Sequence, residues 1–421
     1  MKKFRRQESA SATNVFQFSL AGLILFSLTL IGFSSFVGYK LMANTRPKLA
    51  ETFAVDPKDK SRSVHAGPWG ELITRDIELG RPAEYLTSEV TVPVAETWTF
   101  TAMQPDAVKA LLTKNGLSPA QVADVFERGT FNATTTNMVL TPSAKFLLSL
   151  DAKTRGQLYL GLTGLGVNTY IDNPYIFPSD HINSIYADAH LNPADVALLK
   201  KLIYENGSAR QMSDYQFLLT QIPTVERRVE MARALSRQVA VFAGLVIRPD
   251  TDIDKLAQYW STVSTVRIID IRPLMRALKA LPEGGNLSLF YVLPKFVRDR
   301  LYTYPLPPEP GEPVQNCHWS TFNFSSETPD GRFNDPAFAV PYIEKNYYRI
   351  AAPSEYGDLL LLVNSKNTII HSAVYLAADI VFTKNGNSYS QPWMLMHIPD
   401  LLATYPATPP MNAIYLRHKT N

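Results

Sequence analysis

The residues of this sequence best suited to nucleophilic chemistry are one cysteine and one histidine in the last third of the chain. Cys317 is the single cysteine among 421 residues, so it has no disulfide partner within the chain. A cysteine nucleophile needs a lowered thiol pKa, a base within hydrogen-bond reach and a group that orients the base. The spacing of Trp319 and Phe322 predicts a helix that starts at Cys317, a position that favours a thiolate. His371 lies in an apolar stretch typical of a strand, which would hold a base rigidly.

The elements that must position this pair come after a proline-rich segment, 305–313, in which five of nine residues are proline. Such a segment is extended and stiff. Beyond it, apolar runs at 358–363, 368–376 and 379–383 are separated by Asn-rich and Gly-rich turn residues, which predicts successive strands. The residues from 301 to 421 are therefore expected to form one helix-plus-sheet unit.

Three short motifs in this unit resemble the NlpC-type cell-wall cysteine peptidases, a branch of the papain-like superfamily. They are Gly357-Asp-Leu-Leu-Leu-Leu, His371-Ser-Ala-Val-Tyr-Leu and Asn316-Cys317, the last standing where the family commonly has Asp-Cys. The resemblance covers about residues 302–417. It implies Cys317 as nucleophile and His371 as base, with Asn316 in support. Tyr304 lies 13 residues before Cys317, close to where the family places a tyrosine near the oxyanion site.

The sequence also departs from the family pattern. The family usually continues Cys-Ser-Gly, whereas here Cys-His-Trp follows. The third family residue is expected about twelve residues after the base, where Thr383 fits the spacing and Asn385 is the better chemical analogue. His397, before Ile-Pro, is a further candidate, and the sequence leaves the choice open. Candidates for the substrate cleft are His318, Trp319 and Tyr375.

Cys317 and His371 also have a purely structural interpretation. A lone cysteine is commonly a small buried apolar residue, and a histidine in an apolar strand is commonly a hydrogen-bonded core residue. Zinc binding by Cys317, His318 and His371 is a weaker alternative, since the seven histidines show no tight ligand spacing. We therefore predict no metal and no cofactor. The sequence has no phosphate-binding glycine loop and no Gly-x-Ser-x-Gly elbow.

The N-terminal region predicts export. Four of the 41 basic residues lie within the first six, and no charge occurs between Glu8 and Lys40. An apolar run of about 20 residues is long enough to span a bilayer. We predict a retained anchor over residues 15–41, with the N-terminus cytoplasmic and the bulk extracytoplasmic, or periplasmic, by the positive-inside rule. A cleaved signal peptide is the alternative. The rest of the chain is close to neutral, which gives no electrostatic case for nucleic-acid binding.

The predicted fold class is α+β, with a transmembrane helix, a mainly helical middle and a papain-like C-terminal domain. Helix starts that pair a cap residue with proline, as at Pro105, Ser118-Pro119 and Asn192-Pro193, dominate the middle. The expected divisions are a basic tail (1–14), the anchor (15–41), a stalk (42–103), a helical domain (104–300) and the NlpC-like domain (301–421).

The predicted function is a membrane-anchored thiol hydrolase that cleaves an amide in cell-wall peptides. This substrate follows from the resemblance, because a fold alone does not define a substrate. The alternatives are an inactive domain of the same fold that binds envelope components, and a structural envelope protein. In both alternatives the helical region 104–300 would contact a protein partner.

Overall fold

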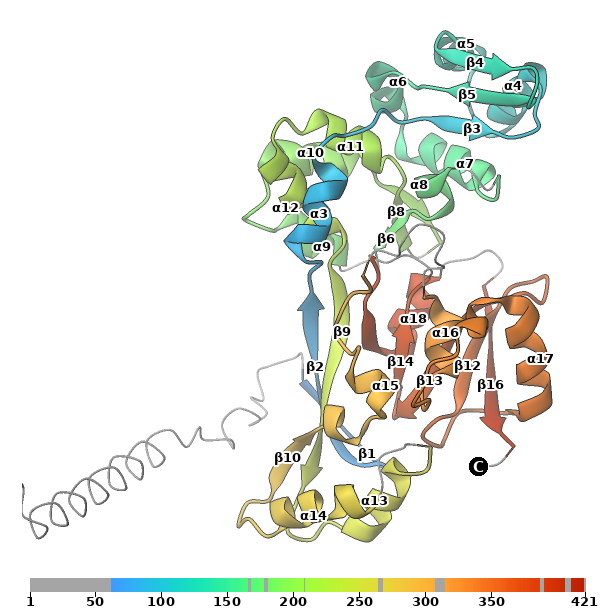
Figure 1. Ribbon diagram of the computed structural model, residues 1–421. Helices are drawn as coiled ribbons and strands as arrows, with labels where there is room; N and C mark the ends of the chain where they lie inside the picture. Colours follow the sequence, from blue (N-terminus) through green and yellow to red (C-terminus); the bar gives the residue numbers. More distant parts are fainter. Residues whose placement is uncertain are drawn as a thin grey trace, which may run out of the picture. The chain divides into compact units, whose positions relative to one another are not determined.

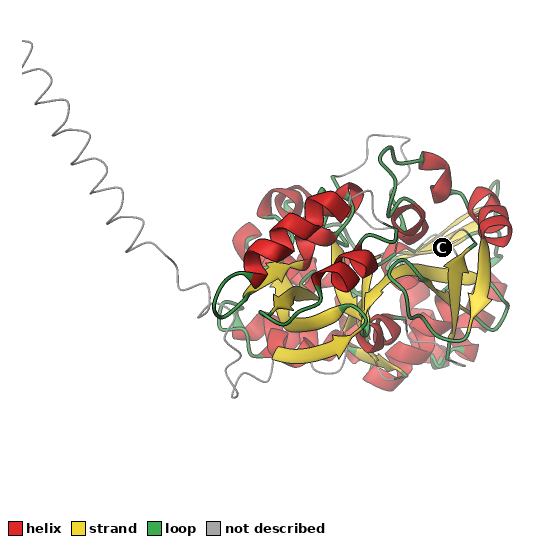
Figure 2. Ribbon diagram, turned by 90° about the horizontal axis from the view of Figure 1, so that it is seen from below, coloured by secondary structure: helices red, strands yellow, loops and turns green. Residues whose placement is uncertain are grey.

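The computed structural model describes residues 62–165, 168–177, 181–207, 209–263, 268–306, 315–386, 390–405 and 410–419. These residues form an α+β structure in which helices and antiparallel sheets occur along most of the chain (Figures 1 and 2). The described residues belong to a single unit.

The predicted fold class is wrong in two respects. The transmembrane helix expected over residues 15–41 lies outside the described residues, and no helix among the described ones is long and apolar enough to cross a membrane. Helices predominate in residues 104–300, but this region also contributes strands to three sheets that the prediction did not include. Those strands are short or pair across long sequence separations, so polar–apolar alternation over a long window did not reveal them. The described chain is α+β with several antiparallel sheets.

Residues 86–235 enclose the first hydrophobic core. Local capping starts many of its helices: the Ser118 hydroxyl accepts from Gln121 N–H while the Gln121 side chain accepts from Ser118 N–H, a capping box. The helices of this part are α3 (Ala83–Val90), α4 (Pro105–Lys114), α5 (Pro119–Phe126), α6 (Ala144–Ser149), α7 (Ala152–Leu162), α8 (Thr169–Asp172), α9 (His181–Tyr186), α10 (Pro193–Leu202), α11 (Tyr215–Gln221) and α12 (Val225–Leu235).

Two small antiparallel sheets complete this part, in the orders β3-β5-β4 and β6-β8-β7. Trp98 and Phe100 are fully buried, and the Trp98 ring meets Phe146 and Tyr159 edge-on. These aromatic contacts fix a strand of only three residues against the helices. The strands are β3 (Trp98–Phe100), β4 (Gly129–Asn132), β5 (Asn137–Leu140), β6 (Tyr175–Phe177), β7 (Tyr204–Asn206) and β8 (Ala209–Met212).

A four-stranded antiparallel sheet is built from segments that precede and follow the first core in the sequence. Its order is β1 (Arg62–Gly67), β2 (Gly70–Leu79), β9 (Gln238–Ile247) and β10 (Gly285–Ser288). β2 pairs with β9 from Glu71 opposite Val246 to Leu79 opposite Gln238 (Figure 1). The chain thus leaves along β2, builds the first core and returns along β9.

The second hydrophobic core joins Leu72 and residues 241–301 with residues 319–416. Its six-stranded antiparallel sheet has the order β11-β16-β12-β13-β14-β15. The strands are β11 (Tyr347–Ile350), β12 (Leu359–Val363), β13 (Ile369–Ala377), β14 (Ile380–Lys384), β15 (Trp393–His397) and β16 (Asn412–His418).

Both faces of this sheet are covered. Leu359 and Leu361 of β12 belong to the core that contains Trp319, whereas Leu360 and Leu362 pack with Leu401 on the other face. A strand that is buried on both faces has a continuous apolar sequence, which explains why every residue of Leu359–Val363 is apolar. The helices here are α13 (Ile253–Trp260), α14 (Ile268–Lys279), η1 (Leu289–Val292), α15 (Lys295–Arg298), α16 (Cys317–Phe322), η2 (Gly331–Asn334), α17 (Pro336–Asn346) and α18 (Ile398–Thr404).

The Gly-Asp-Leu motif before β12 has a structural reason. Gly357 has a φ of +98°, a conformation that glycine adopts without strain. Asp358 is 1% exposed, and its carboxylate accepts from Arg417 Nε at 2.8 Å and from the backbone N–H groups of Ser354 and Glu355. These contacts attach the start of β12 to β16.

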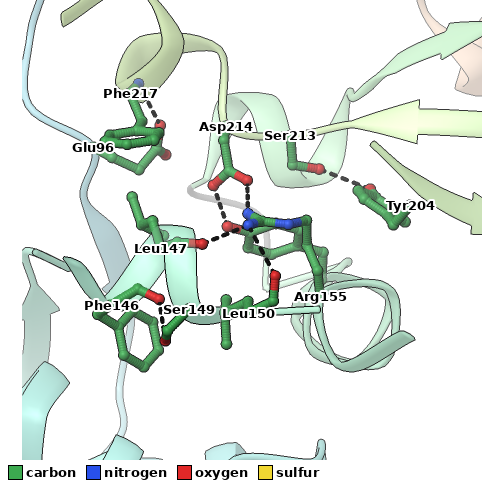
Figure 3. A network of polar contacts seen from close by, with 11 residues as sticks. Glu96, Phe146, Leu147, Ser149, Leu150, Arg155, Tyr204, Ser213, Asp214 and Phe217 are labelled. Carbon is green, nitrogen blue, oxygen red and sulfur yellow. Dashed lines mark hydrogen bonds and ion pairs between the residues drawn. The ribbon is translucent and has the colours of Figure 1, made fainter. Parts of the chain in front are cut away.

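A buried polar network lies inside the first core (Figure 3). The Arg155 guanidinium pairs with Asp214, whose other carboxylate oxygen accepts from the Tyr159 hydroxyl, and Arg155 also donates to the carbonyl of Leu147. Arg155 and Asp214 are fully buried, so each compensates the charge of the other. Glu96 lies nearby and accepts from Phe217 N–H at 3.4 Å.

Glu96 makes stability depend on pH. Burial, and then the negative charge of Asp214, raise the pKa of this carboxyl from 4.5 to about 8. Between these values the unfolded chain loses a proton that the folded chain retains, so the free energy of unfolding falls as pH rises, by up to about 4–5 kcal/mol for this group. Below 4.5 and above 8 the group contributes no slope.

We therefore expect Glu96→Gln to be more stable than the wild type at pH 8 and to match it more closely at pH 5. The Gln carbonyl can still accept from Phe217 N–H. Urea unfolding at both pH values measures the difference, and Glu127→Gln on the exposed surface is the control. Equal pH slopes in the wild type and Glu96→Gln would show that Glu96 is ionised in the folded protein.

Candidate active site

Cys317 is the first residue of α16. The side chain of Asn316 caps this helix by accepting from Trp319 N–H at 2.8 Å, and Asn316 is itself held by two hydrogen bonds to Asn334. α16 packs against β13 and β14. Cys317 is 5% exposed, so its thiol faces the sheet rather than solvent. Asn316 acts here as a helix cap that orients Cys317.

His371 lies on β13 and is fully buried. Its Nε2 is 2.9 Å from the Thr383 hydroxyl, and its Nδ1 is 2.7 Å from the Tyr405 hydroxyl. The Tyr405 ring also packs against the imidazole, with the ring centroids 4.5 Å apart. Both ring nitrogens are thus engaged, one by β14 and one by the residue that follows α18.

The directions of these hydrogen bonds assign the tautomer of His371. Asn385 donates its amide N–H to the Met396 sulfur and accepts the Thr383 hydroxyl proton at 3.4 Å. Thr383 has no second proton, so it accepts from His371 Nε2–H. Nδ1 is therefore the unprotonated nitrogen, and the Tyr405 hydroxyl donates to it. The Tyr405 oxygen in turn accepts from Gly386 N–H at 3.1 Å.

This chain of contacts places both candidates for the third residue. Thr383 contacts the imidazole directly, and Asn385 contacts Thr383. His371, Thr383 and Asn385 therefore form a chain of hydrogen bonds in that order. Residue spacing alone did not predict this order. His397 lies elsewhere, where its Nδ1 is 2.9 Å from Asp379.

The electrostatics of the thiol involve a residue that the sequence analysis missed. Burial raises the pKa of the Cys317 thiol, while the backbone N–H of Ser372 and the positive charge of Lys384 act to lower it. Lys384, the last residue of β14, is fully buried, and its ammonium donates to the carbonyl of Gly386 at 3.4 Å. Burial lowers the pKa of Lys384 to about 7, and Cys317 opposes this shift. Each group therefore favours the charged form of the other.

The pKa shifts of His371 and His318 both favour the neutral imidazole. Burial, and then His318 and Lys384, lower the pKa of His371 to about 3. Burial also lowers the pKa of His318, whose Nδ1 is 2.9 Å from the Ser372 hydroxyl. Ser372 donates its proton to Thr321, so His318 donates from Nδ1. His318 thus bridges α16 and β13.

The other predicted site residues lie in packed surroundings. Trp319 is 4% exposed and packs against Phe296 and beneath the Arg300 guanidinium. Tyr375 is 2% exposed, and burial raises its pKa to about 12. These side chains contribute to the core and do not line an open cleft.

Tyr304 is not brought to the thiol. Its hydroxyl donates to the carbonyl of Leu79 on β2 at 3.0 Å. It lines a pocket of about 380 Å³ whose other lining residues are Glu78, Leu79, Gly80, Pro82, Tyr85, Tyr302 and Thr303. The resemblance assigned Tyr304 to the oxyanion site, but its hydroxyl is bonded to β2 instead.

Two residues of the site, Lys384 and Tyr405, were absent from the sequence analysis. Lys384 continues the apolar run Ile380-Val-Phe-Thr, and a lysine at that place is the one available signal. Tyr405 lies 34 residues after His371, and no spacing rule connects them. In the described part of the chain, no cluster of three or more His, Cys, Asp or Glu side chains could hold a metal ion.

Comparisons with known proteins identify no relative: no family model, no curated protein and no solved structure matches this chain.

Proposed function

We propose that the C-terminal part of this protein is a thiol hydrolase of the NlpC-like type that cleaves an amide bond. The observation that carries the proposal is the placement of Cys317 at the start of α16 against β13, which holds His371 with Nε2 bound by Thr383 and Nδ1 unprotonated. A nucleophile at a helix start, a neutral imidazole and a group that orients it are the parts of a cysteine–histidine mechanism.

The proposed reaction proceeds in two stages. The Cys317 sulfur attacks the amide carbon while the thiol proton passes to His371 Nδ1, and the imidazolium then donates this proton to the leaving amine. Water next attacks the resulting thioester and gives a proton to His371, the C–S bond breaks to release the acid, and the imidazolium returns its proton to the Cys317 thiolate. Thr383 holds the ring orientation, and the Lys384 charge favours the thiolate.

The proposed substrates are the peptide stems or cross-links of bacterial cell wall. This choice rests on the resemblance of the motifs around Asn316, Gly357 and His371. An extracytoplasmic location belongs to the same proposal, because basic residues before an apolar run are typical of exported chains.

A specific observation favours a second candidate, a binding module without turnover. Cys317 is 5% exposed and His371 is fully buried, so neither reaches substrate in this conformation. A domain of the same fold that only binds envelope peptides would retain these residues as packing.

The experiment that separates the two is hydrolysis of defined cell-wall peptides by the wild type and Cys317→Ala. We expect the wild type to release new amino and carboxyl groups, detected by mass spectrometry, and Cys317→Ala to release none above background. Cys317→Ser, which preserves volume, controls for packing. Equal turnover by Cys317→Ala would eliminate the thiol mechanism, and peptide binding without turnover by either protein would favour the binding module.

A further inference from the structure

Tyr405 is the outermost member of the group around the thiol. Cys317 and His371 are buried, whereas Tyr405 keeps part of its surface in solvent. Its ring lies against the imidazole of His371, and its hydroxyl occupies the one nitrogen of that ring that can accept a proton. A single side chain therefore both covers the base and blocks it.

The attachment of Tyr405 allows it to move without disturbing the core. Leu401 is fully buried and anchors α18 to the sheet, but the helix ends at Thr404. Tyr405 follows the last helical residue and is held there by Leu402 O, by Gly386 N–H and by His371. Rotation of this side chain would break two of these hydrogen bonds and leave α18 in place.

The conformation described here does not favour proton transfer from the thiol to the imidazole. Burial raises the pKa of Cys317 and lowers that of His371, and these shifts both oppose formation of a thiolate–imidazolium pair. The titratable side chains that interact with the thiol are Lys384 from β14 and Tyr405 from beyond α18, and Lys384 and His318 in turn act on His371. Access of water would reduce both burial effects.

We propose that Tyr405 is the gate of this site: its hydroxyl holds His371 Nδ1 in a blocked state, and departure of its side chain frees the base and uncovers Cys317. This inference rests on the proposed function, since it assigns a regulatory element to the same cysteine–histidine pair. Tyr405 is a positioning residue in this scheme, because it acts through His371. Occupation of the site by a substrate amide replaces the Tyr405 hydroxyl as the neighbour of Nδ1.

Alkylation of Cys317 by iodoacetamide, measured against pH on the full chain, tests the gate without knowledge of the substrate. Tyr405→Phe keeps the ring but removes the hydroxyl, so Nδ1 is free to accept the thiol proton. We expect labelling about tenfold faster at pH 7 and a lower midpoint pH, since one pKa unit is a factor of ten in thiolate. Tyr405→Ala also removes the cover, so its labelling should be faster still.

Controls separate this effect from general loosening. Leu402→Ala changes the exposed side of α18 and should label like the wild type. In the double variant Tyr405→Phe with His371→Ala, the gain should disappear, because the freed base is absent. The ¹⁵N shift of His371 Nδ1 should move in Tyr405→Phe, a change that altered packing elsewhere would not produce.

The outcomes also separate the gate from the proposed function. If His371→Ala slows labelling but Tyr405→Phe labels like the wild type or more slowly, the pair is active and the gate is wrong. If both variants label like the wild type, the thiol is not activated by His371, and both the proposed function and the proposed gate are wrong.

Discussion

Replacement of His371 by alanine is expected to lower the rate of amide hydrolysis by about 10²–10⁴-fold, the usual contribution of a general base. His371 Nδ1 is the proton acceptor of the proposed mechanism, and its ring nitrogens contact only weakly basic hydroxyls, those of Thr383 and Tyr405, among the described residues. The same variant should slow alkylation of Cys317 at neutral pH, because the thiol loses the base that favours its ionised form.

The measurement compares kcat for cell-wall peptide hydrolysis in the wild type, His371→Ala, Thr383→Val and His190→Ala. Thr383→Val keeps the size of the side chain but removes the acceptor of Nε2–H, so it should reduce kcat by about tenfold through loss of ring orientation. His190 is exposed and serves as the matched control. Unchanged kcat in His371→Ala, with hydrolysis still dependent on Cys317, would assign the base to another group, and Lys384 is the next candidate.

Replacement of Asp214 by leucine is expected to lower the free energy of unfolding by about 3–5 kcal/mol, because it leaves the buried Arg155 charge uncompensated. Arg155 and Asp214 are 0% exposed, so water cannot replace the lost partner. The Tyr159 hydroxyl loses its acceptor in the same variant. Urea unfolding at pH 7 measures the change.

Two further variants show whether the cause is the charge. Arg155→Met combined with Asp214→Leu removes both charges, and buried ion pairs replaced by apolar residues are often neutral or better, so most of the loss should be recovered. Asp106→Ala breaks a surface ion pair in which Asp106 is 94% exposed, and it should cost less than about 1 kcal/mol. A double variant as unstable as Asp214→Leu alone would show that packing, not the unpaired charge, determines the loss.

Local elements of this protein could be predicted where the signal is contained in a few neighbouring residues. Proline and cap residues mark the starts of α4, α5 and α10 at Pro105, Pro119 and Pro193. α6 begins at Ala144, where the Ser143 side chain caps the helix by accepting from Phe146 N–H. The strands β12, β13 and β14 occur where apolar runs separated by turn residues predicted them.

Only part of the candidate site could be predicted from such local sequence patterns. The Cys317 helix start and the strand that holds His371 follow from local patterns, and the spacing of twelve residues indicated Thr383, which contacts the imidazole. Tyr405 and Lys384 were missed because their roles depend on how α18 and β14 pack around the thiol. Tyr304 was assigned by position in the chain, but the fold directs its hydroxyl to β2.

What the sequence by itself determined is therefore local: where helices start, which runs become strands, and which residues have the chemistry for a nucleophile and a base. Tertiary structure alone decided that β2 pairs with β9 across more than 150 residues, that Arg155 meets Asp214, and that Tyr405 covers His371. The physical reason is that caps and turns depend on hydrogen bonds within a few residues. Long-range pairs instead depend on which apolar surfaces are buried together, and that choice is made by the whole chain at once.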